Sequence, residues 1–388
     1  MDFKLSAEQL EIVANVSRIC SDFDPSYWLR CDTEERFPEE FYGKMLEHGY
    51  VGLSLPAEYG GAGLGITEAA LVMQAICESG AGMTGCSTIH SYVFAPNPIV
   101  VHGTEEQKRR MLPPLTSGKE RACFAITEPN TGLDTTKLRS RAVREGDHYI
   151  LTGEKVWPTA ASIADRVLVI ARTTAIDQCK RPVDGLSLFY TPIDRRYVRT
   201  AKIAKLGRNA IESCQIFFDG LPIPVEDRIG EEGKGFYYLL DGLNPERILV
   251  AAEAVGLGRV ALNRAVEYAK DRVVFDRPIG MNQGIQHPLA DSWMKLEAAN
   301  VMMLKAATMY DAGEPCGAEA NTAKYLGAEA GFEACTRAVM SHGGYGYARE
   351  FHVERFLREV LIARLAPISP QLILCYVGER VLGLPKSY

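Results

Sequence analysis

The apolar residues in the first third of the chain recur at the spacing of α-helices. Stop signals divide this pattern into several helices between residues 6 and 123. The first begins at Ser6 and Gln9, which match a capping box in which each side chain accepts a hydrogen bond from an unpaired backbone N–H. The stretch 55–65 is rich in Gly and Pro, which is typical of a turn, and leads into another helix near residue 66. The pattern therefore predicts a helical N-terminal segment.

The pattern changes after residue 121. Short runs rich in β-branched and aromatic residues follow one another, separated by Gly, Asp and Pro. This spacing is typical of strands in a compact all-β unit, which we expect over residues 122–231. The runs that predict strands are HYILTGEKVW, DRVLVIART, GLSLFYTPI, VRTAKIAKL and SCQIFFDGLPI.

Helical spacing returns beyond the glycine-rich joint GEEGKGF at residues 230–236. The apolar positions predict helices at 245–274, 284–310, 318–342 and 370–382, which are long enough to pack as a bundle. The chain is therefore expected to be an α+β multidomain protein, with a helical domain over 1–121, a β domain over 122–231 and a helical bundle over 232–388.

Composition and charge narrow the range of partners. The chain has 388 residues, a formal net charge of −6 and no basic block, which argues against binding to a nucleic-acid backbone. Its seven histidines form no cluster at metal-ligand spacing, so we expect no metal site. The length allows several packed units and room for a large cofactor.

Three features bear on the compartment. The ten cysteines lie far apart and include no C-x-x-C pair, which is typical of thiols in a reducing environment. The N-terminus lacks a basic start followed by an apolar stretch, and no run of about 18 apolar residues is evident. We therefore expect a cytoplasmic protein with no membrane partner.

Taken singly, the motifs carry weak signals of chemistry. The loop AITEPNTGLDT at residues 125–135 offers hydroxyls and backbone N–H groups that can bind a phosphate, but a plain turn has the same composition. Trp157 near Thr159 offers a stacking surface beside a hydroxyl, although a core Trp is the commoner case. The run HGGYGY at 342–347 is typical of a helix stop.

Together and in this order, the motifs resemble the acyl-CoA dehydrogenase family from end to end. The matching stretches are LPAEYGGAG, GTEEQK, LPPLTSG, ITEPNTGLD, GEKVWPT, PVEDRIGEEGKGF, RVVFDRPI and HGGYGY. The resemblance implies an N-terminal helical domain, a middle β-barrel-like domain and a C-terminal four-helix bundle. It also implies FAD held between the middle and C-terminal domains, partly by a neighbouring subunit, in a homo-oligomer that is a dimer or a tetramer.

The resemblance also assigns contacts to the flavin. Phe124, Ile126 and Thr127 would border it, Trp157 would lie against its rings, and Thr159 would donate a hydrogen bond near N5. The further cofactor contacts implied in this way are Gly132, Leu133, Met340, Gly343, Gly344, Ser369 and Gln371, with Leu133 also near the substrate.

A second set of implied contacts crosses the subunit interface. Arg272, Phe275 and Gln286 match the segment that reaches the nucleotide part of FAD, where a guanidinium pairs well with pyrophosphate oxygens. An ordinary surface position is the alternative for Arg272. The segment 81–94 would help to line the acyl pocket.

The family reaction needs a carboxylate that takes the α-proton of the thioester, in a dry pocket where desolvation raises its proton affinity. Most members place this Glu in a loop before the last helix, where this chain has Pro367. Members similar to isovaleryl- and long-chain acyl-CoA dehydrogenases place it at the start of a C-terminal helix, where this chain has Glu246, with Arg247 beside the CoA moiety. Asn244 and Pro245 also form a standard helix start, in which Glu246 would only favour the helix dipole.

Some residues depart from the family pattern. Pro367 has no backbone N–H to hold the thioester carbonyl, a donor whose loss typically costs about 2.7–4 kcal/mol of transition-state stabilisation. Leu133 replaces a common Ser, Met340 a common Gln, and Asp276 the usual Gly. Pro158 fits only an edge strand or a bulged strand.

The leading expectation is the α,β-dehydrogenation of an acyl-CoA to the trans-2-enoyl-CoA, with hydride passing to flavin N5 and electrons passing on to an electron-transfer flavoprotein. Two alternatives stay open. One is a family relative with other flavin chemistry, either an oxidase or a non-dehydrogenating enzyme, and the other is a non-catalytic acyl-CoA-binding protein. The motifs do not encode the length or branching of the acyl chain.

Overall fold

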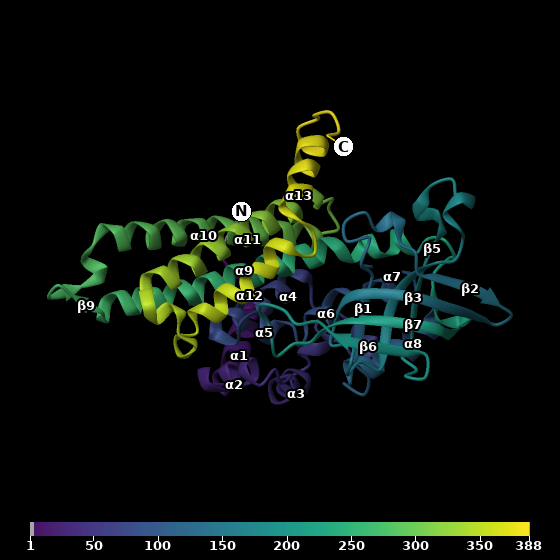
Figure 1. Ribbon diagram of the computed structural model, residues 1–388, viewed down its shortest axis with the longest axis horizontal. Coiled ribbons are helices and arrows are strands. Elements are labelled where there is room, and N and C mark those ends of the chain that lie inside the picture. The colour runs from purple at the N-terminus through teal and green to yellow at the C-terminus, as the bar shows by residue number, and fades with distance from the viewer. Residues whose placement is uncertain (1–3, 388) are drawn as a thin grey trace.

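The computed structural model describes residues 4–387 and places the helices and the strands in separate regions (Figure 1). The N-terminal region is helical, and its first helix has the predicted capping box, with Gln9 N donating to Ser6 Oγ over 3.1 Å. Helix α4 is capped from the C-terminal region, because Ile66 N and Thr67 N donate to Asp311 over 2.7 and 2.8 Å. The helices of this region are α1 Ala7–Ser21, α2 Pro25–Thr33, α3 Glu39–Glu47, α4 Ile66–Ile76, α5 Gly82–Cys86, α6 His90–Phe94, α7 Asn97–His102 and α8 Glu105–Thr116.

The middle of the chain forms a mixed β-sheet in the order β6-β7-β3-β2-β4-β5-β8, with β1 parallel to β4. The register of β3 on β7 shifts between Val156 and Thr159. Pro158 therefore lies in a bulge, which confirms the expectation that it needs an irregular strand. The strands are β1 Ala122–Ala125, β2 Arg141–Glu145, β3 His148–Thr159, β4 Arg166–Arg172, β5 Leu186–Pro192, β6 Val198–Lys202, β7 Ser213–Pro224 and β8 Arg228–Ile229.

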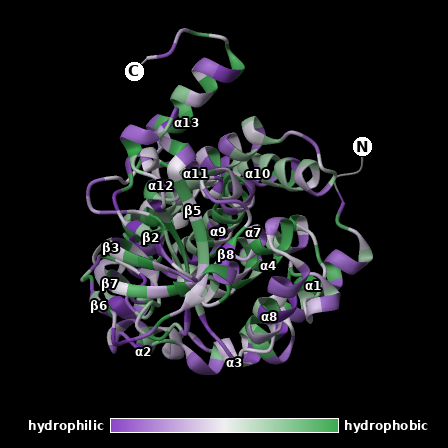
Figure 2. Ribbon diagram, turned by 90° about the vertical axis from the view of Figure 1, so that its right-hand side faces the viewer, coloured by the Kyte–Doolittle hydropathy of each residue, from purple (hydrophilic) through white to green (hydrophobic). Residues whose placement is uncertain are grey.

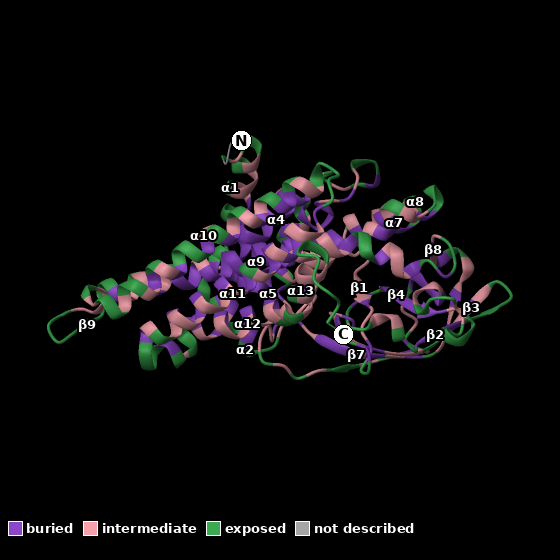
Figure 3. Cartoon of the chain, turned by 90° about the horizontal axis from the view of Figure 1, so that it is seen from above, coloured by how far each residue is buried: buried purple, intermediate pink, exposed green. Residues whose placement is uncertain are grey.

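The C-terminal region is a bundle of long helices, whose buried residues gather along α9 where it passes α4 and α11 (Figure 3). Helices α9 and α11 approach closely, since a Cβ added at Gly331 would lie 2.4 Å from the carbonyl oxygen of Ala254. The expected fold class is confirmed, whereas the domain limits at residues 121 and 231 stay predictions. The bundle helices are α9 Gly235–Asp271, α10 Gln283–Asp311, α11 Gly317–His342 and α12 Val353–Leu365, of which α12 was not predicted.

Helix α9 begins earlier than the sequence predicts, and Pro245 lies inside it. A proline within a helix leaves the carbonyl four residues before it without its usual N–H partner. Here that carbonyl belongs to Asp241, and the hydroxyl of Tyr310 donates to it over 3.5 Å. The prediction that Asn244 and Pro245 start a helix is therefore wrong. Glu246 does not lie at the positive end of a helix dipole.

The last part of the chain leaves the bundle. Helix α13 Pro370–Tyr376 and the π-helical turn η11 Val377–Val381 project from it (Figures 1 and 2). The stretch Val353–Val381 has the length and mean hydropathy of a membrane span, and 17% of its most apolar window is buried. It is not an unbroken apolar run, since Arg364, Ser369 and Gln371 lie within it. Because residues 366–369 interrupt the helix, the stretch is only a weak indication of a membrane span.

Candidate active site

Glu246 lies in the part of α9 that passes the N-terminal helices, where the charges that act on it are those of His90, Arg247 and Glu253. Glu253 follows Glu246 by two helical turns, so both carboxylates lie on one face of α9, about 10 Å apart along the axis. Burial raises the pKa of the Glu246 carboxyl to about 7, against the opposing effect of the positive charges of His90 and Arg247. A carboxyl with this pKa can accept a proton near neutral pH.

His90 of α6 pairs with Glu253 across the contact between the two helices, with 2.6 Å between Nδ1 and Oε1. Burial lowers the pKa of His90, but the carboxylates of Glu253 and Glu246 outweigh this effect, so the pKa is raised. The guanidinium of Arg208, which donates to Ser87 Oγ over 2.9 Å, also acts on His90. The sequence did not predict this cluster, because the histidines show no spacing that indicates a site. The position of His90 in the segment expected to line the acyl pocket was the available signal.

Arg247 follows Glu246 on α9, and one nitrogen of its guanidinium group has no hydrogen-bond partner within residues 4–387. That nitrogen is the buried Nε, whereas Nη1 donates to Asn244 Oδ1 over 2.8 Å. Burial lowers the pKa of Arg247. A buried donor without a partner is costly, so this one is available to an acceptor from outside the chain.

The loop before α13 carries Pro367 where most family members have their base. Lys324 Nζ donates to the carbonyl of Ile368 over 2.6 Å, which fixes the backbone of this loop. Burial lowers the pKa of Lys324 to about 8. Ser369 caps α13 by accepting from Leu372 N over 3.3 Å, and Gln371 is exposed on the first turn of the helix. Ser369 and Gln371 thus lie at the start of α13, the helix that projects from the bundle (Figure 1).

The residues predicted to border the flavin come together at the end of β1 and the bulge of β3. The carbonyl of Thr127 accepts from Val156 N over 2.8 Å, which joins the two segments. Trp157 has a φ of +74° and is 55% exposed. A left-handed backbone is rare for a bulky residue and marks local strain. Trp157 is therefore not a core residue, and its ring is presented for stacking, with Thr159 two residues further along the strand.

An aromatic chain connects this flavin-side strand to Glu253. The ring of Phe124 on β1 lies 5.2 Å from that of Phe94, which lies 5.2 Å from the imidazole of His90. His90 is in turn paired with Glu253. The structure therefore brings the predicted flavin strand, α6 and the carboxylate face of α9 into one site.

The loop at residues 126–140 has features that fit a bound phosphate or flavin. Thr131 Oγ1 is buried and finds no partner in the described part of the chain, while Gly132 and Leu133 are exposed. Buried hydroxyls are normally satisfied, so Thr131 is a further candidate contact, which no motif in the sequence singles out. The unpaired hydroxyl of Thr131 and the exposed ring of Trp157 together fit a bound FAD.

A second group of predicted cofactor contacts lies at the opposite end of the bundle, near the hairpin of β9 Val273–Val274 and β10 Arg277–Pro278 (Figure 1). At an axial rise of about 1.5 Å per residue, the C-terminal end of α9 is about 38 Å from Glu246. One chain therefore does not bring the two groups together. The residues of this distal group are Arg272, Phe275, Gln286, Met340, Gly343 and Gly344.

The distal group has an unusual exposed conformation. Phe275 and Asp276 form the two-residue loop of the hairpin, with φ of +53° and +62°, and Phe275 is 94% exposed. The carboxamide of Gln286 donates to the carbonyl of Gly280 over 2.7 Å. The guanidinium of Arg272 lies over the ring of Tyr345 at 5.7 Å. An exposed aromatic ring on a left-handed backbone indicates a surface that is covered in the working protein.

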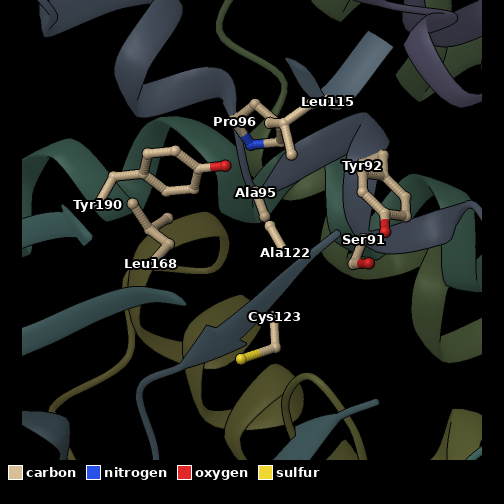
Figure 4. Close-up of a pocket in the computed structure, with 9 residues that line it drawn as sticks. All are labelled: Ser91, Tyr92, Ala95, Pro96, Leu115, Ala122, Cys123, Leu168 and Tyr190. Carbon is tan, nitrogen blue, oxygen red and sulfur yellow. The ribbon is translucent and has the colours of Figure 1, made fainter. Parts of the chain in front are cut away.

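Two partly open pockets are lined by residues of α6, the helix that carries His90. Figure 4 shows an apolar pocket between α6, β1, β4 and β5, into which the buried hydroxyl of Tyr190 brings a polar atom. Two of its lining residues, Ser91 and Tyr92, belong to the segment 81–94 that was expected to line the acyl pocket. The second pocket has a volume of about 130 Å³. Its lining includes Val93, Asn97, Pro245 and Tyr310. Pro245 directly precedes Glu246 on α9, but Glu246 itself does not line this pocket.

Comparison with known proteins agrees with this architecture. Family models match in order: the acyl-CoA dehydrogenase N-terminal domain over residues 6–119, the middle domain over 123–221 and the C-terminal domain over 233–367. The chain is 36% identical to acyl-CoA dehydrogenase fadE12 of Mycobacterium bovis, over 99% of this chain and 98% of that protein.

Solved structures are similar over their whole length. A chain from the structure of the electron transferring flavoprotein of Acidaminococcus fermentans has a TM-score of 0.92 and 31% identity, covering 98% of this chain and 100% of that one. PigA, solved with FAD and proline, has a TM-score of 0.93 and 26% identity, covering 99% and 100%.

The fold and the three matched domains define an oxidoreductase of the flavoprotein class. The chain belongs to the acyl-CoA dehydrogenase family. Its domains are those of an FAD-dependent acyl-CoA dehydrogenase.

Proposed function

We propose that this protein dehydrogenates an acyl-CoA thioester between its α- and β-carbons, with Glu246 as the base. The thioester loses a proton from the α-carbon to the Glu246 carboxylate and a hydride from the β-carbon, and a trans double bond forms between the two carbons. Bound FAD supplies the hydride acceptor, at N5. The product is the trans-2-enoyl-CoA.

The observation that carries this proposal is the setting of Glu246. Burial raises its pKa to about 7, which suits proton abstraction at neutral pH. The alternative position in the loop before α13 is Pro367, which has no acidic group. The unused Nε of Arg247 supports a role next to the thioester or the CoA moiety.

The contacts with FAD are proposed to come from two subunits. Phe124, Trp157 and Thr159 would hold the flavin of one subunit, with Thr131 near the phosphates. The distal group, which includes Arg272 and Phe275, lies too far away on the same chain, so a neighbouring copy would supply it. The 94% exposure of Phe275 supports this arrangement. A homo-oligomer, either a dimer or a tetramer, follows from it.

The physiological electron acceptor is proposed to be an electron-transfer flavoprotein. The similarity to a chain solved with the electron transferring flavoprotein of Acidaminococcus fermentans supports this. We also propose a cytoplasmic location and the division of the chain at residues 121 and 231.

The proposal is tested by anaerobic mixing of the FAD-loaded protein with butyryl-, isovaleryl- and octanoyl-CoA while the flavin absorbance is recorded. We expect prompt bleaching with at least one thioester. Glu246→Gln should slow this bleaching at least about a hundredfold while thioester binding persists. Glu267→Gln is the matched control, because Glu267 is an exposed carboxylate on the same helix.

Each alternative gives a different result. If Glu246→Gln reduces at the wild-type rate, Glu246 is not the base. An unchanged flavin spectrum with every thioester, despite measurable binding, would favour a non-catalytic acyl-CoA-binding protein. Rapid reoxidation of the reduced protein by oxygen would favour an oxidase.

A further inference from the structure

The pair formed by His90 and Glu253 acts electrostatically on the proposed base, and Glu253 lies on the same face of α9 as Glu246. Nδ1 of His90 and Oε1 of Glu253 are 2.6 Å apart, and the side chains are 17% and 7% exposed. The exposed pair of His102 and Asp241 has the same 2.6 Å separation, but its partners do not act on Glu246. Of these two pairs, only that of His90 and Glu253 acts on Glu246.

The charged groups around Glu246 and His90 come from several elements. His90 and Arg247 bring positive charge to Glu246, from α6 and α9 respectively, and Glu253 brings negative charge. Arg208, from the segment before β7, faces His90, and Glu359 of α12 faces Arg208. Among these groups His90 has the strongest charge effect on Glu246.

We propose that His90, held by Glu253, is a positioning residue that keeps a positive charge beside Glu246 and thereby sets the pH range in which Glu246 accepts the α-proton. This inference rests on the proposed role of Glu246. A positive charge favours the ionised form of a nearby carboxyl, so the charge of His90 lowers the pKa of Glu246 and partly opposes the effect of burial. The carboxylate of Glu253 keeps His90 protonated and fixes its ring, which makes the pair a unit.

The experiment uses whichever of butyryl-, isovaleryl- and octanoyl-CoA reduces the wild-type protein fastest. It measures how the rate of flavin reduction by this thioester depends on pH. Removing the positive charge in His90→Gln should move the midpoint of the rising limb to higher pH by about 1 unit. His102→Gln is the matched control, and its midpoint should equal that of the wild type. Exchange of the α-hydrogen of the same thioester with solvent deuterium, followed by NMR, should shift in parallel.

A second variant tests the inference independently if His90→Gln fails to fold. The double variant His90→Gln/Glu253→Gln removes both charges and leaves two amides that can bond to each other. Because the effect of His90 on Glu246 exceeds that of Glu253, its midpoint should also lie above that of the wild type, by less than in the single variant.

The possible failures are distinguishable. A midpoint in His90→Gln or in the double variant equal to that of the wild type overturns the inference, even if Glu246→Gln abolishes reduction. Wild-type reduction by Glu246→Gln instead overturns the proposed function on which the inference rests. An equal shift in His102→Gln would also refute the inference, because it would show that the effect does not depend on the position of the charge.

Discussion

The ammonium group of Lys155 lies 2.9 Å from Oε1 of Glu128, and the two side chains are 0% and 6% exposed. Lys155 also donates to the carbonyl of Ile126 over 3.0 Å, and Glu128 accepts from the backbone N–H groups of Arg139 and Ser140. The pair therefore ties β3 to both ends of the loop that we propose to hold FAD. Burial lowers the pKa of Lys155 to about 8.

Replacement of Lys155 should damage both stability and cofactor binding. In Lys155→Met the carboxylate of Glu128 stays buried without its cation, which typically costs about 3–5 kcal/mol. We expect a correspondingly lower midpoint in urea unfolding and a lower content of FAD in the purified protein. Lys270→Met is the control, because Lys270 pairs with Glu267 at the surface and should have little effect. Full FAD occupancy in Lys155→Met would contradict the proposed role of the pair.

Trp157 provides a test of strain at the flavin site. A left-handed backbone costs about 1–2 kcal/mol for a residue with a Cβ, and glycine avoids this cost. The greater flexibility of glycine in the unfolded chain cancels about 0.5–1 kcal/mol of that gain. We therefore expect the apoprotein of Trp157→Gly to be more stable than that of Trp157→Ala. Both variants lack the ring and should bind FAD about tenfold more weakly. Calorimetry and fluorescence titration with FAD measure the two effects. Wild-type FAD affinity in both variants would show that Trp157 does not contact the cofactor.

The raised pKa of Glu246 should make stability depend on pH. Its pKa is about 7 in the folded protein against 4.5 in the ordinary case, so the folded protein holds a proton that the unfolded chain releases in this range. The free energy of unfolding at this site therefore falls as the pH rises from about 4.5 to 7. Glu246→Gln, which has no such proton to lose, should be more stable than the wild type at pH above 7. The difference should shrink at acidic pH, and thermal unfolding at several pH values measures it. A difference that is the same at every pH would contradict the assigned pKa.

Phe275 should be needed for assembly. Its ring is 94% exposed in the single chain, and a partner subunit or the partner's cofactor would cover it. We expect Phe275→Ser to shift the protein toward monomers in size-exclusion chromatography with light scattering, and to release FAD. Leu10→Ser is the control, because Leu10 is also exposed, at 56%, but lies on the first helix. An unchanged mass together with full FAD occupancy would refute this prediction.

Local signals predicted much of the architecture. The capping box at Ser6 and Gln9 depends only on neighbouring residues, and it forms as expected. The strand runs and the bulge at Pro158 are likewise local, since proline cannot donate to a regular ladder. The start of α9 was mispredicted, because Pro245 is a local stop signal that is overcome by a distant hydroxyl, that of Tyr310.

The sequence by itself determined the order of helical, β and helical regions, the family, and the identity of the residue proposed as the base, because periodicity, turn chemistry and motif order are written along the chain. Only the tertiary structure decided which groups surround Glu246. His90, Arg208 and Glu253 are far apart in sequence, and their charges act on one another through space in a buried setting. The pKa of a carboxyl depends on that setting, so no local pattern encodes it.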